Sequence, residues 1–358
     1  MKAANRRTSA SLILVAPNEG RSNDYNLLML KRSDNTAVVP NQTVFPGGLL
    51  DSEADESVAW LQYFDEFGVP QKELRRLVLI SNDRPAILAP QGNGCYDRFF
   101  KNSIIWSREI TLRLNALREC FEEVGVLLGR SIKDLKDFGP VACVQNVPNL
   151  QNWQQRVHNK PSEFLTLCRE LKVVPDLWAL HEWSAWASPG FLRKGYETVF
   201  FMAFVTSQPK LLAERSEVKE TLWSTPIEFL QMTNLGEIWL LPPQIYELSR
   251  LMGVKTYKSL LDFAVKRSAL GTTMFVPVTY ECEGRMVFVL PGDDFYVPEP
   301  HLVREIINFP GTLEEFQSRS KCIHRYISNA SIFDVELNFS PPNNHLKPLK
   351  FHQERQKL

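Results

Sequence analysis

The chain has 358 residues, of which 41 are basic and 41 are acidic, so its formal net charge at neutral pH is zero. Nucleic-acid-binding proteins usually carry a basic excess, which argues against duplex DNA or bulk RNA as a partner. No apolar run approaches the ~20 residues that cross a bilayer, so we expect no membrane span. The six cysteines are scattered without a CxxC pair, which argues against a zinc site or a disulfide framework and fits a reducing compartment.

The first third of the chain begins with strands. Residues 11–16 and 26–31 are apolar runs separated by the turn signal Pro17-Asn18-Glu19-Gly20. The basic amino terminus leads directly into the first run, so we expect no cleavable signal there. Residues 44–48, with the sequence VFPGG, predict a strand that runs into a two-glycine turn, where backbone can approach a ligand closely.

A carboxylate-rich helix is the strongest chemical signal. At ~100° per residue, one stripe of the helix is apolar and a separate arc is acidic. The stripe holds Leu114, Leu117, Phe121 and Val124, and the arc holds Glu119, Glu122 and Glu123. Gly125 is placed to end the helix. Packed carboxylates need a cation, and hard oxygen ligands suit Mg²⁺ or Mn²⁺. The alternative interpretation is a solvated acidic face on an ordinary amphipathic helix.

Together, Phe45-Pro46-Gly47-Gly48 and the segment RECFEEVGV at 118–126 resemble the box of the Nudix hydrolases. That box reads glycine, five residues, glutamate, seven residues, then R-E-U-x-E-E-x-G-U, and its second half matches here without a gap. Gly48 and Arg118 are 70 positions apart, so about 56 residues are inserted into the box. Ala54 stands where the family has its loop glutamate. The acids Asp51, Glu53 and Asp55 lie nearby, and the assignment among them stays open.

The resemblance implies roles for the box residues. Glu122 and Glu123 would be metal ligands, and Glu119 would be a ligand or would orient the attacking water. Arg118 would hold these carboxylates by ion pairing, and the Gly47 carbonyl is a possible further ligand. Nudix enzymes commonly take a general base from outside the box, and the sequence does not identify it.

A second segment resembles the Nudix branch that acts on coenzyme A and its thioesters. Arg32 and Ser33 lie at the distance from Phe45 that this branch's pattern requires, but Ala37 and Asn41 replace its second arginine and its glycine. We therefore expect Arg32, Ser33, Gly47 and Gly48 to bind substrate, with Arg32 as the candidate cation for the 3′-phosphate of CoA.

The reaction implied by this resemblance is metal-dependent hydrolysis of the pyrophosphate of CoA or acyl-CoA. The products would be 3′,5′-ADP and 4′-phosphopantetheine or its acyl form. One alternative is a diphosphatase for ADP-ribose, a nucleotide sugar or capped RNA. A non-catalytic Nudix-fold binding protein is the alternative from another class.

The resemblance implies an α/β fold, a Nudix α/β/α sandwich over residues 8–235 with an insertion at about 53–108. The insertion is rich in apolar residues, so we expect it to be ordered, to pack within itself and to shape substrate access or form a dimer contact. It contains an expected helix over 52–68, and another over 151–171 is expected to break at Pro161.

Residues 236–358 match no motif and predict an α+β extension. Within it we expect helices over 244–252 and 259–266, a hairpin made of 274–278 and 286–290, and an extended tail. The carboxyl terminus, Gln356-Lys357-Leu358, partly matches the S-K-L peroxisomal address. With the resemblance, this favours the peroxisome, with the cytoplasm or mitochondrion as alternatives.

Overall fold

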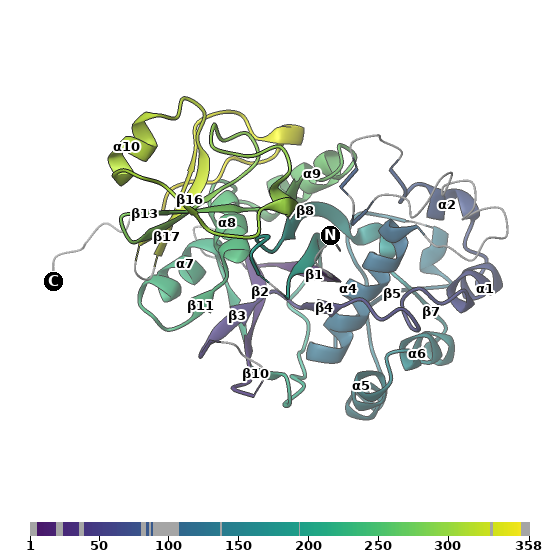
Figure 1. The fold of residues 1–358 in the computed structure, drawn as a ribbon. Coiled ribbons are helices and arrows are strands. Elements are labelled where there is room, and N and C mark those ends of the chain that lie inside the picture. The colour runs from purple at the N-terminus through teal and green to yellow at the C-terminus, as the bar shows by residue number, and fades with distance from the viewer. Residues whose placement is uncertain are drawn as a thin grey trace.

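The computed structural model describes residues 6–18, 24–35, 39–79, 84–85, 87–88, 107–136, 138–192, 194–329 and 332–351. Its main sheet follows the order β11-β3-β2-β1-β9-β8-β12, with β10 paired to β2 and β4 paired to β1 (Figure 1). These strands are β1 (Arg7–Pro17), β2 (Tyr25–Arg32), β3 (Gln42–Val44), β4 (Gly47–Leu49), β8 (His181–Ala187), β9 (Tyr196–Phe204), β10 (Val218–Ser224), β11 (Trp239–Leu240) and β12 (Met274–Phe275). The two strands expected first, β1 and β2, pair antiparallel, while β1 and β9 form a long parallel pair at the centre.

Helices cover both faces of this sheet, so the expected α/β/α sandwich is confirmed. Side chains of β1 alternate between two separate cores: Leu12 and Leu14 belong to one, Ile13 and Val15 to the other. The first face carries α1 (Ala59–Glu66), α2 (Gln71–Arg75), α4 (Arg108–Val124), α5 (Leu150–Asn159) and α6 (Glu163–Leu171). The second carries α7 (Pro226–Asn234), α8 (Pro242–Leu251) and α9 (Tyr257–Ser268). None of the helices within the described ranges is long and apolar enough to cross a bilayer.

A small sheet of order β6-β5-β7 flanks the first face. It consists of β5 (Leu127–Ser131), β6 (Val144–Gln145) and β7 (Val173–Pro175), with 3₁₀ turns at Asp134–Lys136 and Leu177–Ala179. The expected interruption at Pro161 is confirmed, because α5 ends at Asn159 and α6 begins at Glu163.

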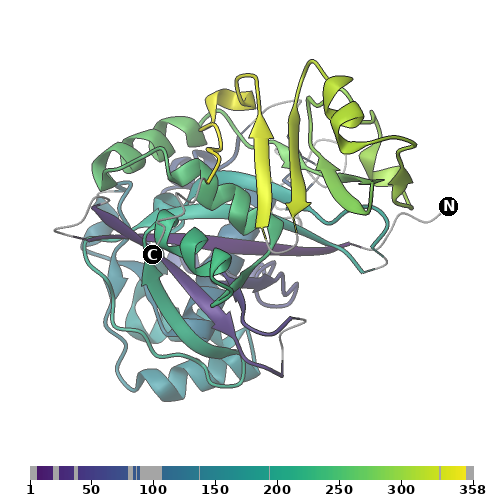
Figure 2. The ribbon, with the colours of Figure 1, turned by 90° about the vertical axis from the view of Figure 1, so that its left-hand side faces the viewer.

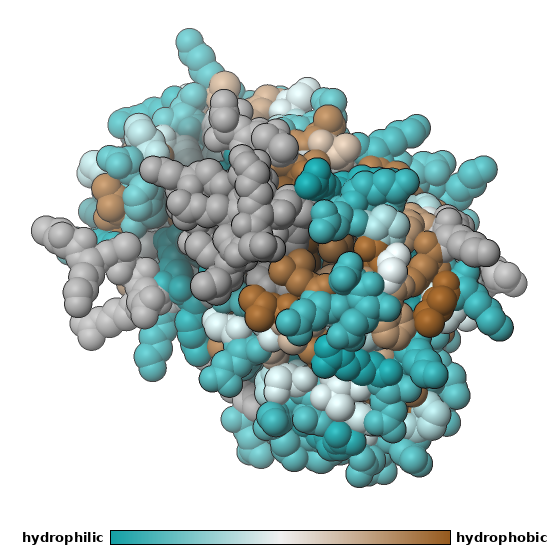
Figure 3. All heavy atoms as spheres, turned by 90° about the vertical axis from the view of Figure 1, so that its right-hand side faces the viewer, coloured by the Kyte–Doolittle hydropathy of each residue, from teal (hydrophilic) through white to brown (hydrophobic). Residues whose placement is uncertain are grey.

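The described part of the insertion packs into the main core. Its expected helix is shorter than 52–68, since α1 covers only Ala59–Glu66. Trp60, Tyr63 and Phe64 are buried in the same apolar cluster as α4, α5 and α6, so the expectation of separate packing is wrong for this part. The Tyr63 hydroxyl donates to the carbonyls of Cys168, at 2.7 Å, and Val173, at 2.5 Å. Figure 3 shows the outer surface on this side, which is largely hydrophilic toward α5 and α6.

Residues after 235 contribute to the main sheet and also form a sheet of their own. β11 pairs with β3 and β12 pairs with β8, so each edge of the main sheet receives a short strand. The second sheet has the order β15-β13-β14-β16-β17 and lies on the side of α8, away from α4 (Figures 1 and 2). Its elements are β13 (Val278–Cys282), β14 (Arg285–Val289), β15 (Ile307–Asn308), α10 (Leu313–Ser318), β16 (His324–Asn329) and β17 (Ile332–Leu337), with 3₁₀ turns at Pro300–Leu302 and Pro342–Asn344.

The expected hairpin is confirmed for β13 and β14, which pair antiparallel through Glu283-Gly284. The residues expected to begin its first strand, Met274 and Phe275, pair with β8 instead. The expected helices of this region appear as α8 and α9. The terminal Gln356-Lys357-Leu358 lies outside the described residues.

Candidate active site

The candidate site is built on the last turns of α4. The apolar stripe of this helix is at most 1% exposed, and the helix ends at Gly125, whose φ is 71°. Each of the last four helical carbonyls accepts a hydrogen bond. The Gly125 amide donates to Phe121 and the Gln154 side chain to Glu122. The amides of Glu214 and Leu212 donate to Glu123 and Val124. The segment around Leu212 and Glu214 is therefore fixed beside the carboxylates.

The glycine loop meets this helix directly, although its sequence lies far upstream. The Gly47 amide donates to Oε2 of Glu123 at 2.8 Å. Gly47 has a φ of +150°, and a Cβ there would lie 2.3 Å from the Ala10 carbonyl oxygen. A Cβ on Gly48 would lie 2.4 Å from Oε2 of Glu119. Gly47 therefore requires glycine, whereas a side chain at Gly48 would displace Glu119, and the two halves of the motif form one site.

Arg118 organises the acidic groups around itself. Its Nε and Nη2 donate to the two Asp55 oxygens at 2.8 and 2.9 Å, while Nη1 donates to Glu122 at 2.6 Å. Nη1 also lies 3.0 Å from the carboxylate of Glu119. Both Arg118 and Asp55 are only 2% exposed, so this ion pair is buried. Arg118 therefore holds the carboxylates, in the role expected for it.

The geometry also distinguishes the acids of the loop. Asp55 is the one that pairs with Arg118, and it also accepts from the Asp51 amide at 2.9 Å. Asp51 instead turns back to accept from the Ala54 amide at 2.8 Å, and Glu53 is exposed. Among the three acids left open by the sequence, Asp55 is the one joined to α4.

The acidic face of α4 is buried, which rules out the alternative of a solvated surface. Glu122 is 7% exposed and Glu123 is 8% exposed, because the glycine loop and the Asp55 segment pack over them. Burial raises the pKa of Glu122 to about 7 and that of Glu119 to about 8. The pKa of Glu123 is also raised, first by burial and then by the charge of Glu119.

The donor set fits a hard divalent cation in its chemistry. Glu119, Glu122 and Glu123 offer only carboxylate oxygens, and burial with mutual repulsion penalises their charged forms until a cation compensates. Their present orientations differ from a finished ligand sphere: over the described ranges, no three His, Cys, Asp or Glu side chains converge in a way that could hold a metal. Glu122 is turned toward Arg118 and Glu123 toward Gly47.

Glu217 is an acid near the cluster that the motif did not identify as a site residue. Its charge raises the pKa of all three box glutamates. The residue lies just before β10, far from the box in sequence, and its backbone carbonyl accepts from the Ser33 amide at 2.8 Å. Glu217 opens a segment, 217–226, that resembles a pattern near the end of Nudix domains, but its place beside α4 depends on the pairing of β10 with β2.

The upstream segment borders the same site. Arg32, the last residue of β2, acts on Glu123 through its charge, which lowers the pKa that burial raises. The Ser33 hydroxyl donates to the Ser216 carbonyl at 2.6 Å, which fixes the segment that carries Glu217. Asn41 has a φ of 61°, a left-handed conformation that asparagine tolerates, so it preserves the backbone shape that the family's glycine would allow. Ala37 lies outside the described residues.

Comparisons with known proteins agree with this architecture. The family model of the NUDT19 Nudix domain matches residues 4–251. The acyl-coenzyme A diphosphatase NUDT19 of Xenopus laevis is 32% identical over 351 residues, covering 94% of this chain and 90% of the relative. The human protein of the same name is 32% identical over 364 residues, covering 96% and 94%.

A solved structure provides a comparison of the fold alone. A NUDIX hydrolase from Alicyclobacillus acidocaldarius matches with a TM-score of 0.50 and 18% identity, over 72% of this chain and 96% of that protein. With the family model matching more than half of the chain, and the motif halves joined through α4 and the glycine loop, the chain belongs to the NUDT19 Nudix family.

Proposed function

We propose that this chain hydrolyses the pyrophosphate of CoA and acyl-CoA, releasing 3′,5′-ADP and 4′-phosphopantetheine or its acyl form. The observation that carries the proposal is the buried carboxylate cluster of α4, closed against the glycine loop by the bond from Gly47 to Glu123. Curated relatives of matching length are named acyl-coenzyme A diphosphatases, which supports this substrate class. Arg32 beside the cluster offers a cation for a substrate rich in phosphate.

The proposed cofactor is Mg²⁺ or Mn²⁺, since Nudix enzymes generally need a divalent metal. Glu119, Glu122 and Glu123 would hold it after turning from their present partners. When bound, such an ion neutralises pyrophosphate charge and lowers the pKa of a bound water.

The chain's own groups then have separate tasks. Arg118 and Asp55 keep the carboxylates in place through buried hydrogen bonds. Gly48 leaves room for Glu119 to lie directly against the loop. Glu217, outside the box and close enough for its charge to act on all three glutamates, is the candidate general base.

A substrate panel tests this proposal. CoA, an acyl-CoA, ADP-ribose, NADH and capped RNA are compared for kcat/KM with Mg²⁺ or Mn²⁺, and products are identified by mass. We expect CoA and acyl-CoA to be preferred, with cleavage at the pyrophosphate. Glu122→Gln should reduce turnover by roughly 10²–10³-fold, as for loss of an electrostatic group at a reacting centre. Glu220→Gln, an exposed change on β10, is the matched control.

Three results would count against the proposal. Preference for ADP-ribose, NADH or capped RNA would support the alternative diphosphatase. Tight CoA binding without hydrolysis would support a binding protein. Near-full activity of Glu122→Gln at limiting Mg²⁺ would show that the acidic face of α4 is not the catalytic centre.

We further propose a peroxisomal location, supported by the terminal Gln356-Lys357-Leu358 together with the family resemblance. A fluorescent protein fused to the amino terminus of the chain should co-localise with a peroxisomal marker. Deletion of the terminal tripeptide should disperse it. Unchanged localisation after that deletion would remove the tripeptide as the address.

A further inference from the structure

A second polar site lies on the opposite face of the main sheet from the carboxylates. It is a small cavity between β8, β12, α8, α9 and the tail that follows β17. Its volume of about 10 Å³ accommodates roughly one water-sized sphere. The lining residues are Trp183, Ser184, Arg250, Arg267, Thr273, Phe275, Pro342, Asn343 and His345. Asn343 is exposed, so the cavity is reached from solvent on the side of the tail.

Three of the residues that line this cavity each carry a buried hydrogen-bond donor for which the described part of the chain supplies no acceptor. These donors are the Nε of Arg250, the Nε of Arg267 and the hydroxyl of Ser184. The residues are 1%, 2% and 3% exposed, respectively, so all three groups are buried. Native proteins rarely leave buried donors unpaired, and three around one cavity indicate an occupant that accepts hydrogen bonds.

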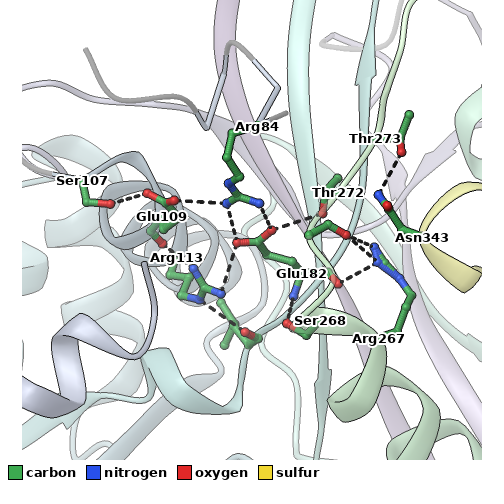
Figure 4. A network of polar contacts seen from close by, with 12 residues as sticks. Arg84, Ser107, Glu109, Arg113, Glu182, Arg267, Ser268, Thr272, Thr273 and Asn343 are labelled. Atoms are coloured by element: carbon green, nitrogen blue, oxygen red, sulfur yellow. Dashed lines mark hydrogen bonds and ion pairs between the residues drawn. The ribbon is translucent and has the colours of Figure 1, made fainter. Parts of the chain in front are cut away.

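The nearby carboxylates already have partners. Glu247 accepts from the indole nitrogens of Trp183 and Trp186, each at 2.8 Å, and pairs with Arg250 at 3.1 Å. Glu182 accepts two hydrogen bonds from Arg84, both at 2.8 Å (Figure 4). These carboxylates therefore cannot turn toward the cavity without giving up buried hydrogen bonds.

Arg267 has no such partner. Within the described ranges, no carboxylate lies within ion-pair distance of it, and its guanidinium donates to the Gly271 carbonyl at 2.9 Å and to the Glu182 carbonyl. Figure 4 shows this side chain on the far side of Glu182 from Arg84 and Arg113. Burial, followed by the charge of Arg250, lowers the pKa of Arg267 to about 10. Over the described part of the chain, Arg267 thus carries a buried positive charge without an ion-pair partner, and only the more distant charges of Glu182 and Glu247 act on it.

His345 does not supply the missing negative charge or a free acceptor. Its Nδ1 accepts from the Leu346 amide at 2.7 Å, so the ring proton lies on Nε2, which faces the Trp183 carbonyl at 3.1 Å. Burial, Arg250 and Arg267 all lower its pKa, which keeps the ring neutral. Among the described residues of this region, the guanidinium groups of Arg84, Arg113, Arg250 and Arg267 outnumber the carboxylates of Glu109, Glu182 and Glu247 by four to three.

We propose that this cavity binds a small monovalent anion, such as chloride, held by the Nε–H groups of Arg250 and Arg267 and the hydroxyl of Ser184. The cavity is small, about 10 Å³, which favours a monatomic ion over a polyatomic oxyanion such as phosphate or sulfate. Since Pro342, Asn343 and His345 form one wall, the bound anion also fastens the tail to β8 and α9. This site is separate from the carboxylate cluster and does not depend on the reaction proposed for it.

The test compares thermal stability in sodium chloride, sodium bromide and sodium gluconate at equal ionic strength. Binding to the native state raises Tm in a saturable way, so we expect an increase with either halide over gluconate. Ser184→Ala should weaken halide affinity by roughly tenfold, because it removes one hydrogen bond to a charged group. Arg267→Met should abolish the halide response. Ser249→Ala, another buried hydroxyl on the same face, should leave the response unchanged.

Crystals soaked in bromide provide the second measurement. An anomalous peak within hydrogen-bond distance of both arginines and Ser184 would support the site. A water in that position without anomalous signal would overturn the proposal. A halide response that persists in Ser184→Ala and Arg267→Met would overturn it as well, because it would arise elsewhere.

Discussion

The two ends of α4 both carry buried charge, but acids predominate at one end while acids and bases are matched at the other. Toward its carboxyl end, one guanidinium, Arg118, stands among four carboxylates from Asp55, Glu119, Glu122 and Glu123. Toward its amino end, Glu109 and Arg113 join Arg84 and Glu182 in a network where arginine hydrogen bonds stabilise each carboxylate (Figure 4).

The difference appears in the acidity of the glutamates. At the carboxyl end burial raises the pKa of all three box glutamates. At the amino end the two carboxylates differ: burial raises the pKa of Glu109, whereas hydrogen bonding to Arg84 and the charges of Arg84 and Arg113 overcome burial and lower the pKa of Glu182. The first region retains a negative charge that an external cation can neutralise, whereas the second fixes Arg84 of the insertion to the sheet.

The same substitution should therefore have opposite effects in the two regions. Glu182→Gln leaves buried guanidinium groups without their carboxylate and should lower the free energy of unfolding by about 3–5 kcal/mol. Glu123→Gln in metal-free protein removes a repelled charge and should leave stability equal or higher. Urea unfolding of both variants without divalent metal measures the contrast. Equal losses would show that the two regions do not differ in their electrostatics.

A second prediction addresses the acid that substitutes for the loop glutamate. Asp55→Asn breaks the buried pair with Arg118 and should cost about 3 kcal/mol of unfolding free energy. Glu53→Gln is the control two positions away, and as an exposed change it should remain within about 0.5 kcal/mol of wild type. If Glu53→Gln had the larger effect, the loop in solution would present a different acid to the helix.

The third prediction concerns Arg32 and substrate choice. A charge-assisted contact is worth about 1.5–3 kcal/mol, or roughly one to two decades in kcat/KM. We expect wild type to prefer CoA over 3′-dephospho-CoA, and Arg32→Ala to remove most of that preference. Kinetics on both substrates with both proteins decide the point. Equal losses on the two substrates would assign Arg32 to the pyrophosphate. This is the main alternative role, because the charge of Arg32 already acts on Glu123.

The last prediction concerns how the stability of the metal-free protein depends on pH. Glu122 and Glu119 have folded-state pKa values raised to about 7 and about 8, so they bind protons more tightly when folded. Their stabilising contribution is complete below the unfolded pKa of ~4.5 and is lost as pH rises through 7 to 8. We expect stability to fall between pH 5 and 8, measured by denaturant unfolding with a chelator present. Saturating Mg²⁺ at pH 8 should reverse it, and a rise in stability with pH in the chelated protein would contradict the raised pKa values.

Much of this fold could be predicted because its signals are local. The apolar stripe of α4, its end at Gly125 and the break at Pro161 follow from periodicity and backbone preference within a few residues. Nothing local indicates that Trp239-Leu240 or Met274-Phe275 would extend the main sheet. A two-residue strand shows no alternation, and its pairing depends on an edge made far away in sequence. The division of the chain near residue 235 stays a prediction.

The candidate site was predictable in its residue types but less so in its environment. The motif identified Arg118 and the three glutamates, yet their burial depends on the loop carrying Asp55 and on the turn before β10, which are distant segments. The choice of Asp55 over Glu53 could not be made by counting positions, because it depends on how the inserted chain turns after β4. The positions of Glu217 and Arg32 relative to α4 also could not be predicted locally, because they depend on how β10 pairs with β2.

The separation between Gly48 and Arg118 has a consequence in polymer terms. Lengthening a closed loop about fivefold, as this insertion does to the motif, adds only ~1.4 kcal/mol of closure entropy in the ideal-chain limit. The two buried hydrogen bonds of Tyr63, which hold part of the insertion against the core, are of comparable worth. A long connection between the two halves of the box therefore costs little free energy in this fold. A chain cut inside the insertion and expressed as two co-folding fragments should still assemble a Nudix box.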